Sequence, residues 1–553
     1  MRRVKAVFNR GKIVLSNISK FADKWVLVID DMEGMRSQLR MSLTNSGFAK
    51  LHIVANIREA LERMANNRYD VILCDYSLGD STDGQQFLEH LRTNDLISRN
   101  TIFVMITAEQ AYEKVVAASE CAPDDYLLKP FTASQFNARL EKLLERQAYF
   151  ASIDKAADAK DWTRVIAECD RALPTKNKYF LELCKTKAAA LMHSNRPQEA
   201  ANLYREMLAL RPIGWARLGL ARALALLGQK DEAQQIAREI LTDSPQFMAA
   251  YDFLGGQLAS SGEKNAALDV LQKAREVSPG TMNRIRELST LAVSAGQPEL
   301  AESVMRQALQ KHKYSPVRQV NDYAILSKAL TSQGKADEAL SVVADARKDF
   351  RDEHSQIVLA TSESVAHRAA GNDELAEAAL AKAMAGDINT LPVETVTAIA
   401  DACFALGKED EANKLLRHAI QNNPEDETIK SKVHDVLTAA GKEITEADAM
   451  IEDSTQEIIR INNEGVRKAE SGQFDEAAEL LSEAADRLPN NLQIVGNAAL
   501  VIALHLVKSG NNPKLLAQCL RYRDLLVKKS PDYPKITQID SQLRLLQSQK
   551  IGQ

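Results

Sequence analysis

Acidic and basic side chains stand directly after short apolar runs in the N-terminal quarter of the chain. Asp30 and Asp31 follow one run, Asp75 follows another, and Lys129 follows a third. If these runs are parallel strands, their carboxyl ends meet at one edge of a sheet and the four side chains converge. Three carboxylates in one pocket repel each other and demand a cation, and an all-oxygen ligand set suits Mg²⁺ or Mn²⁺.

A hydroxyl group and this lysine complete a set suited to phosphoryl transfer. Thr107 follows a further apolar run, between Asp75 and Lys129. A metal ion and an ammonium group neutralise the equatorial oxygens of a transferring phosphoryl group, so catalysis is mostly positioning and electrostatics. A carboxylate in this pocket can act as the nucleophile, and the sequence favours Asp75 for that role.

The elements that must position these residues alternate between strand and helix over residues 25–147. Apolar runs rich in β-branched residues predict buried parallel strands, and stretches of helical period separate them. The expected strands are Trp25–Ile29, Leu51–Val54, Val71–Cys74, Thr101–Ile106 and Tyr126–Leu128. The expected helices are Gly34–Ser46, Ile57–Asn66, Gly84–Arg92, Glu109–Ser119 and Ala133–Arg146. This alternation predicts a doubly wound, flavodoxin-like α/β domain with its functional loops at the carboxyl ends of the strands.

Length and composition exclude several other classes of protein. The chain has 553 residues, too many for one compact core, and its 45% apolar and 26% charged residues argue against global disorder. A net charge of −5 argues against non-specific nucleic-acid binding by the whole chain. The six cysteines form no CxxC motif, which is typical of a reducing compartment. No apolar run approaches the ~18–20 residues of a transmembrane helix, and we expect a cytoplasmic protein.

Residues 1–24 form a basic N-terminal extension with seven Lys or Arg and one acidic residue. The apolar stretches on either side of Asn9-Arg10-Gly11 would suit a short hairpin, and a solvated tail fits the composition equally well.

From residue 148 onward, the strands give way to a helical pattern with a period near 34 residues. Small residues mark the period: a glycine, an alanine five residues later and a second alanine seven residues further on. The glycines are Gly228, Gly262, Gly296, Gly334, Gly371, Gly407, Gly441 and Gly472. The alanines are Ala233, Ala267, Ala301, Ala339, Ala376, Ala412 and Ala477, then Ala274, Ala308, Ala346, Ala383, Ala419 and Ala484. The glycine would end the first helix of a pair, and the alanines would let the helices approach closely.

Two resemblances follow from these patterns. WVLVIDD, VILCDYS, VMITA and DYLLKPF resemble the receiver domain of bacterial response regulators, with 44 residues from Asp31 to Asp75 and 22 from Thr107 to Lys129. The repeat resembles the tetratricopeptide repeat (TPR) and fits best over Tyr251–Pro279. Together they imply a receiver domain at 25–147 and an all-α TPR superhelix of about ten repeats at 148–553, with degenerate outer repeats.

The receiver resemblance implies a role for each residue at a motif position. Asp75 corresponds to the phosphoacceptor. Asp30 and Asp31 correspond to the acidic pair that holds Mg²⁺ or Mn²⁺ together with Asp75. The main-chain carbonyl of Ser77 would be a further metal ligand.

The same resemblance assigns the switch residues. Thr107 would turn its hydroxyl to the phosphoryl group, Tyr126 holds the position of the switch aromatic, and Lys129 would pair with phosphate and acceptor across a cis Lys129-Pro130 bond. Ser77 and Glu109 flank the expected path of a hydrolytic water and are candidates for tuning dephosphorylation. The loop that follows Asp75 departs from the family: Gly84 comes nine residues on instead of eight, and Gly79 replaces a proline.

The residues between the α/β domain and the repeats suggest how a signal would pass from one to the other. Residues 131–173 lack Gly and Pro, so Ala133–Lys160 predicts one or two helices that run from the receiver into the first repeat. A stiff junction would pass a shift at Thr107 and Tyr126 to the array, whose groove would bind protein.

We therefore expect a two-component response regulator that catalyses its own phosphorylation and dephosphorylation at Asp75 without conventional enzyme turnover. Its partners would be a histidine kinase or phosphotransfer protein and an unidentified protein ligand of the array, with no nucleic acid and no membrane insertion. A homodimer through the receiver stays open. Two alternatives also stay open: an auxiliary modulator that inhibits or diverts phosphotransfer in another two-component system, and a constitutive TPR scaffold with a vestigial receiver.

Overall fold

The computed structural model describes residues 21–78, 83–108, 123–175, 178–279, 281–313, 315–510, 512–531 and 533–551. The chain divides into two compact units. The first comprises Met1–Leu288 and Arg306–Arg318, and the second comprises Ser289–Met305 and Gln319–Gln553. The expected helix Glu109–Ser119 and the hairpin around Asn9-Arg10-Gly11 lie outside the described residues.

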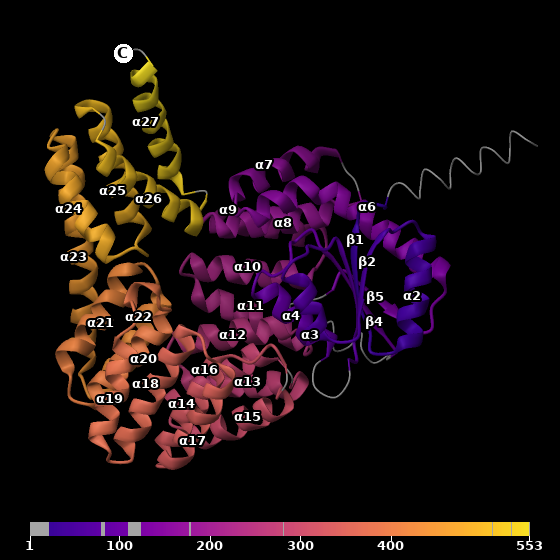
Figure 1. The fold of residues 1–553 in the computed structure, drawn as a ribbon, viewed down its shortest axis with the longest axis horizontal. Helices are drawn as coiled ribbons and strands as arrows, with labels where there is room; N and C mark the ends of the chain where they lie inside the picture. Colours follow the sequence, from indigo (N-terminus) through magenta and orange to yellow (C-terminus); the bar gives the residue numbers. More distant parts are fainter. Residues whose placement is uncertain are drawn as a thin grey trace, which may run out of the picture. The chain divides into compact units, whose positions relative to one another are not determined.

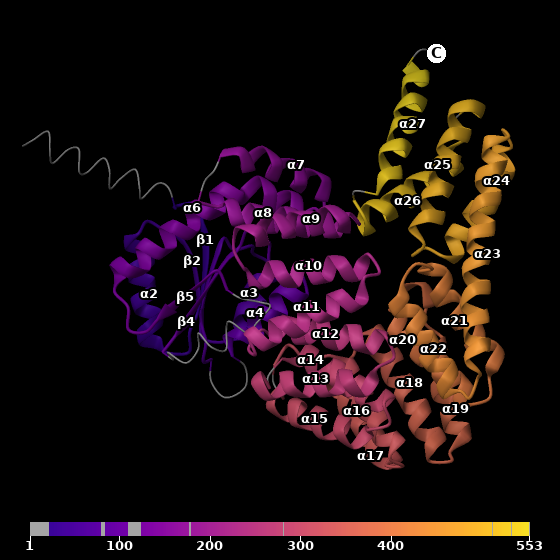
Figure 2. The same ribbon diagram turned by 180° about the vertical axis from the view of Figure 1, so that it is seen from behind.

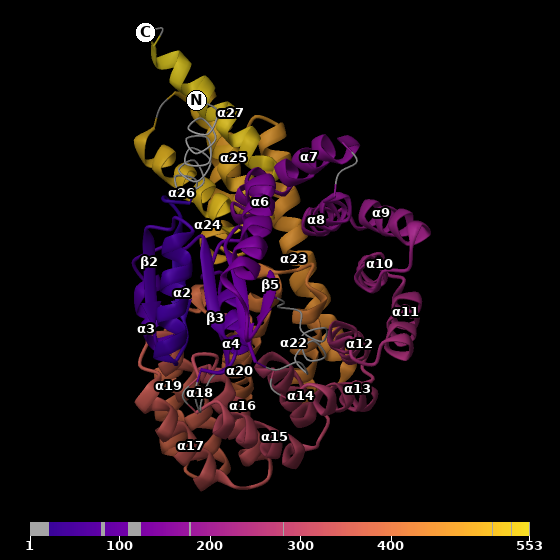
Figure 3. The ribbon, with the colours of Figure 1, turned by 90° about the vertical axis from the view of Figure 1, so that its right-hand side faces the viewer.

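A five-stranded parallel sheet forms the centre of the N-terminal α/β domain (Figure 3). Its strands are β1 (Trp25–Ile29), β2 (Lys50–Val54), β3 (Val71–Asp75), β4 (Ile102–Thr107) and β5 (Asp125–Leu128). Their order is β2-β1-β3-β4-β5, and each expected strand agrees with the observed one to within a residue at either end. The doubly wound fold predicted from the alternation of apolar runs is confirmed.

Helices cover both faces of this sheet because its strands are apolar on both sides. Helices α2 (Glu33–Asn45) and α6 (Ala133–Asp158) pack on the face that carries Val26 and Val28. Helices α3 (Ile57–Met64) and α4 (Gly84–Thr93) pack on the opposite face, which carries Leu27 and Ile29. Successive residues of β1 thus point into two separate apolar cores.

Helix α6 belongs both to the α/β domain and to the helical repeats that follow it. A capping box between Thr132 and Gln135 starts it, and it runs for 26 residues without interruption. Phe136 in its first half packs against the sheet, whereas Phe150 and Ile153 in its second half pack in the core of the first helical repeats. The sequence predicts one or two helices over Ala133–Lys160, and the structure has a single helix, which Figures 1 and 2 show leading from the sheet to α7.

Helices α7 to α27 are here called the helical array. Several of them pack as pairs of consecutive helices: α8 with α9, α10 with α11, α12 with α13, α16 with α17, α18 with α19, α20 with α21, and α24 with α25. Their bounds are α7 Trp162–Ala172, α8 Phe180–His193, α9 Pro197–Leu210, α10 Gly214–Leu226, α11 Lys230–Asp243, α12 Met248–Ser260, α13 Lys264–Val277, α14 Met282–Ser294, α15 Pro298–Lys311, α16 Val320–Ser332, α17 Ala336–Asp349, α18 Glu353–Ala369, α19 Asp373–Met384, α20 Val393–Ala405, α21 Glu409–Asn422, α22 Glu427–Ala439, α23 Ile444–Glu470, α24 Phe474–Arg487, α25 Leu492–Ser509, α26 Pro513–Lys529 and α27 Pro534–Ile551. Two short 3₁₀ turns, Leu173–Thr175 and Ile388–Thr390, lie between helices.

Left-handed residues make the turns inside the pairs. All eight glycines of the sequence pattern have φ between 71° and 84°, a conformation that a side chain disfavours. Lys160 and Asn195 adopt φ of 56° and 54° after α6 and α8. They take the place of glycine in the first turns, where the sequence pattern is weakest.

Buried alanines let the paired helices approach. Every alanine of the pattern is at most 4% exposed. The pattern is also degenerate in the region of α22 and α23, where α23 extends to 27 residues.

One helix departs from the expectation about apolar length. Among the described residues, α25 alone is long and apolar enough to cross a membrane by length and composition. Its residues Ile494, Val495, Ala498 and Ile502 are fully buried in the C-terminal core of the array, so the array itself accounts for its apolar character.

Candidate phosphoryl-transfer site

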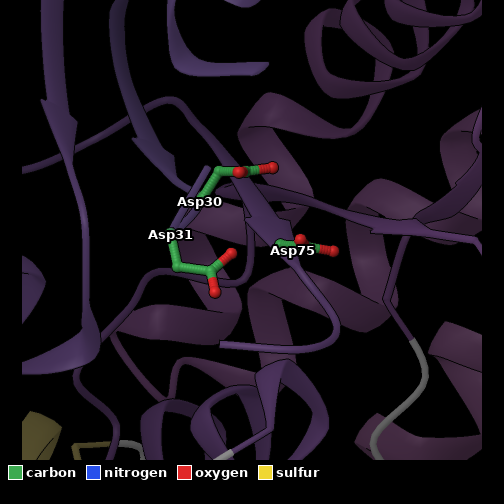
Figure 4. Close-up of side chains that lie close together, drawn as sticks. All are labelled: Asp30, Asp31 and Asp75. Carbon is green, nitrogen blue, oxygen red and sulfur yellow. The ribbon is translucent and has the colours of Figure 1, made fainter. Parts of the chain in front are cut away.

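Three carboxylates converge at the carboxyl ends of β1 and β3, which we call the carboxyl edge of the sheet. Asp30 and Asp31 follow β1 directly, and Asp75 is the last residue of β3. One carboxylate oxygen from each residue lies within 4.8 Å of the others. Figure 4 shows the three side chains together, with Asp75 beside the adjacent pair Asp30 and Asp31. The convergence predicted from strand ends is therefore present.

Lys129 binds two of these carboxylates. Its Nζ lies 2.8 Å from Asp75 Oδ2 and 3.1 Å from Asp30 Oδ2. Burial works against the lysine charge, but hydrogen bonding and attraction to Asp75 and Asp30 outweigh it and raise the pKa of Lys129. The Lys129-Pro130 peptide is cis, as the resemblance implied.

Asp30 and Asp31 differ sharply in their surroundings. The Asp30 side chain is fully buried, and its Oδ1 accepts a hydrogen bond of 2.8 Å from the amide of Met32. Asp31 is exposed. Asp30 is thus held by the protein through both oxygens, while the Asp31 carboxylate faces solvent.

Asp75 is 6% exposed. Burial raises its pKa, and the hydrogen bond and charge of Lys129 and a hydrogen bond from the Ser77 amide act in the opposite direction. The loop after Asp75 is longer than in the family pattern, and its ends still meet: Ser77 pairs with Asp83, and the Gly84 amide donates to the Tyr76 carbonyl at 2.7 Å. A Cβ on Gly84 would lie 2.5 Å from the Asp75 carbonyl oxygen, so the glycine is needed for this approach.

The remaining expected site residues lie on neighbouring elements. Thr107 ends β4, is 2% exposed, and its carbonyl accepts a 2.7 Å hydrogen bond from the Lys129 amide. Tyr126 lies on β5, half-buried against the core beneath α3 and α4. Glu109 lies outside the described residues.

Arg36 is a residue of this edge that the sequence patterns do not reveal. Its Nη1 donates to the main-chain carbonyls of Asp30 and Asp31, at 2.7 and 2.8 Å. Contacts to main-chain oxygens leave no pattern of paired residue types. The sole signal is a cation in the first turn of the helix that follows the acidic pair.

The charge of the cluster and its donor atoms fit a divalent cation. Three carboxylates face one ammonium group, which leaves a formal charge of −2. All donors are oxygens, and one of the carboxylates is open to solvent, as suits a hydrated Mg²⁺ ion. Asp30, Asp31 and Asp75 are the residues that would hold the ion.

Comparisons with known proteins agree with this reading. Residues 26–141 match the response regulator receiver domain, and residues 191–258 match a tetratricopeptide repeat. Response regulator MprA of Mycobacterium sp. (strain KMS) is 32% identical over 121 residues, 22% of this chain and 50% of that protein. The chain spans about half the length of the curated relatives it matches.

Solved structures give weaker likenesses. The receiver domain of the Francisella response regulator 1452 is 27% identical, with a TM-score of 0.20 over 22% of this chain and 98% of that chain. A tetratricopeptide repeat protein from Parabacteroides merdae ATCC 43184 is 15% identical, with a TM-score of 0.36 over 46% of this chain and 98% of that chain.

The fold and the site define an α/β receiver domain followed by pairs of helices. The chain carries a response regulator receiver domain at residues 26–141 and tetratricopeptide repeats that include residues 191–258. Receiver domains generally bind Mg²⁺ and take their phosphoryl group from a histidine kinase, and TPR arrays bind proteins. The chain therefore joins a receiver domain to repeats of a type that binds proteins.

Proposed function

We propose that this protein accepts a phosphoryl group on Asp75 from a partner histidine kinase or phosphotransfer protein, and that phosphorylation changes what the helical array binds. The observation that carries the proposal is the Asp75 carboxylate held 2.8 Å from Lys129 Nζ and beside the acidic pair Asp30 and Asp31. An acceptor, a cation-binding pair and a fixed ammonium group are the parts that phosphoryl transfer to a carboxylate requires.

The transfer step follows from these groups. A carboxylate oxygen of Asp75 attacks the phosphorus of the partner's phosphohistidine. The new P–O bond forms as the P–N bond breaks, and the imidazole nitrogen keeps the electron pair. Lys129 neutralises charge on the acceptor and the phosphoryl oxygens, and the Thr107 hydroxyl donates to one of those oxygens.

Asp30, Asp31 and Asp75, with the Ser77 carbonyl, would hold Mg²⁺, which supplies further charge neutralisation when it is bound. The buried Asp30 fixes the inner side of this cluster, and the exposed Asp31 leaves its outer side open to a hydrated ion and to the incoming phosphoryl group.

Helix α6 supports a route from the site to the array. The Lys129 amide is bonded to Thr107, and α6 begins four residues after Lys129 and ends in the core of the first repeats. A shift of Thr107 and Lys129 on phosphorylation would move the start of a helix that is continuous with the array.

A cytoplasmic location belongs to the same proposal. Its support is that the described cysteines, Cys74, Cys169, Cys184, Cys403 and Cys519, are all unpaired and buried.

The test compares what the full chain captures from a native lysate with and without Mg²⁺ and beryllofluoride, which mimics the acyl phosphate at Asp75. We expect at least one partner whose capture changes with the mimic in the wild type and does not change in Asp75→Asn. Identical captures in all samples would contradict phosphorylation-modulated binding and favour a constitutive scaffold.

A second measurement separates the modulator alternative. The full chain is added to a purified kinase and a different response regulator, and labelling of that regulator is followed. Diversion of phosphate that persists with Asp75→Asn would favour a modulator that acts through the array.

A further inference from the structure

The acidic pair Asp30 and Asp31 sits on a loop whose carboxylates are unequally held. The Asp30 carboxylate has two partners, the Met32 amide and Lys129. Among the described residues, no hydrogen bond or ion pair is found for the exposed Asp31 carboxylate. The position of the Asp31 side chain therefore depends on how its own main chain is fixed.

Arg36 holds the carbonyl groups of this main chain. One guanidinium nitrogen, Nη1, donates to the carbonyls of both acidic residues, at 2.7 and 2.8 Å. The start of α2 lacks the ordinary alternative, because its N-cap Met32 makes no side-chain capping bond. Arg36, in the first turn of α2, thus ties the acidic loop to the helix that follows it.

The Arg36 guanidinium also leaves the carboxylate oxygens of the acidic cluster free for a cation. In the described structure it makes no ion pair with Asp30, Asp31 or Asp75, so it occupies none of the carboxylate oxygens that a cation would need. Groups that contact the ligands of a metal, and not the metal itself, orient those ligands and commonly change the metal affinity.

We propose that Arg36 is a positioning residue that sets the affinity of the acidic cluster for Mg²⁺ by holding the Asp30–Asp31 main chain. This inference rests on the proposed function, since it assumes that the cluster binds the ion. It assigns Arg36 no contact with the phosphoryl group, so Arg36 should affect how much Mg²⁺ is required and not the rate at saturation.

The test measures Mg²⁺ binding to the full chain by isothermal titration calorimetry in the wild type, Arg36→Ala, Arg36→Lys and Arg40→Ala. Arg40 is the matched control, because it is exposed on the same helix one turn later and its loss removes the same charge. We expect Arg36→Ala to weaken Mg²⁺ binding about tenfold, Arg36→Lys to fall between wild type and Arg36→Ala, and Arg40→Ala to match the wild type. Thermal unfolding without metal shows whether each variant is folded.

A second readout follows labelling by acetyl phosphate as a function of Mg²⁺ concentration. For Arg36→Ala, the half-saturating Mg²⁺ concentration should rise about tenfold while the rate at saturating Mg²⁺ is retained. Equal Mg²⁺ affinity in Arg36→Ala and Arg40→Ala would overturn the positioning role. If the wild type itself bound no Mg²⁺, the proposed function would fail, which is a different and recognisable outcome.

Discussion

The two edges of the central sheet use the same residue types for opposite purposes. At the carboxyl edge, Asp30, Asp31 and Asp75 face Lys129, and negative charge is left over. At the opposite, amino edge, where the strands begin, three cations pair with three carboxylates. The cations are Lys24, Arg92 and Arg146, and the carboxylates are Asp70, Asp124 and Glu182.

The amino edge is closed around one amide side chain. Gln147 of α6 is 3% exposed, accepts from Lys24 Nζ at 2.9 Å, and donates to the carbonyls of Asp70 and Asn100 at 3.2 and 2.8 Å. Its neighbour Arg146 donates to Glu182 of α8 at 2.6 Å. The partners in these bonds come from both the receiver and the array.

This difference distinguishes a candidate binding site, the carboxyl edge, from a structural contact, the amino edge. Clustered carboxylates with excess negative charge are candidates for cation binding, so the carboxyl edge is where a cation and a phosphoryl group would act. Ion pairs between side chains of the protein fix geometry, so the paired charges of the amino edge fasten the receiver to the first helices of the array. Substitutions at the carboxyl edge should change phosphoryl-transfer chemistry, and substitutions at the amino edge should change stability alone.

The largest effect is expected from Asp75→Asn. The amide keeps the shape of the side chain but removes the nucleophile, so labelling by acetyl phosphate with Mg²⁺ should fall by at least about a thousandfold. Thermal unfolding should show a folded protein, because loss of one of three clustered carboxylates relieves repulsion. Residual labelling near the wild-type rate would place the acceptor elsewhere.

Lys129→Met should change both chemistry and stability. Loss of the ammonium group leaves the fully buried Asp30 without its cation, which should cost about 3 kcal/mol in the free energy of unfolding. Added Mg²⁺ should restore part of this loss, because it supplies the missing positive charge. Urea unfolding with and without Mg²⁺ measures the loss of stability and its recovery. An equal loss in the two conditions would argue against a cation at this edge.

The sequence predicts the carboxyl edge far better than the amino edge. Carboxylates that follow apolar strands, such as Asp30 and Asp75, are visible because their type and position are both unusual. Gln147 and Asp154 look like ordinary polar residues in a helix, and their burial depends on α8 and on the loop before β4, which are distant in sequence. Lys160 and Asn195 escape the repeat pattern in the same way, since the left-handed turn is imposed by packing rather than by glycine.

Asp154 tests the amino edge through pH. It is 8% exposed on α6, and burial raises its pKa from 3.8 to about 6. The charged groups around it are Arg146, Asp158, Glu182 and Arg99. Because the folded state holds the proton more tightly than the unfolded state, this residue should make stability fall as pH rises from about 4 to about 6.

Asp154→Asn should remove this fall. The variant should match the wild type near pH 4, where Asp154 is protonated, and be more stable at pH 7 by up to about 3 kcal/mol. Urea unfolding at several pH values measures the difference. A wild type and variant with parallel pH profiles would show that Asp154 does not titrate in this range.

Gln147→Ala should give the smallest loss and the cleanest separation of the two edges. It leaves the carbonyls of Asp70 and Asn100 without a donor from α6, so the free energy of unfolding should fall by about 2 kcal/mol. Mg²⁺ affinity and acetyl phosphate labelling should stay at wild-type values, because β3 and β4 separate this cluster from the carboxyl edge. Glu141→Ala is the control, an exposed position on the same helix, and should change neither property. A loss of Mg²⁺ affinity in Gln147→Ala would mean that the amino edge and the carboxyl edge are coupled through the sheet itself. The two edges would then not have separate structural and chemical roles.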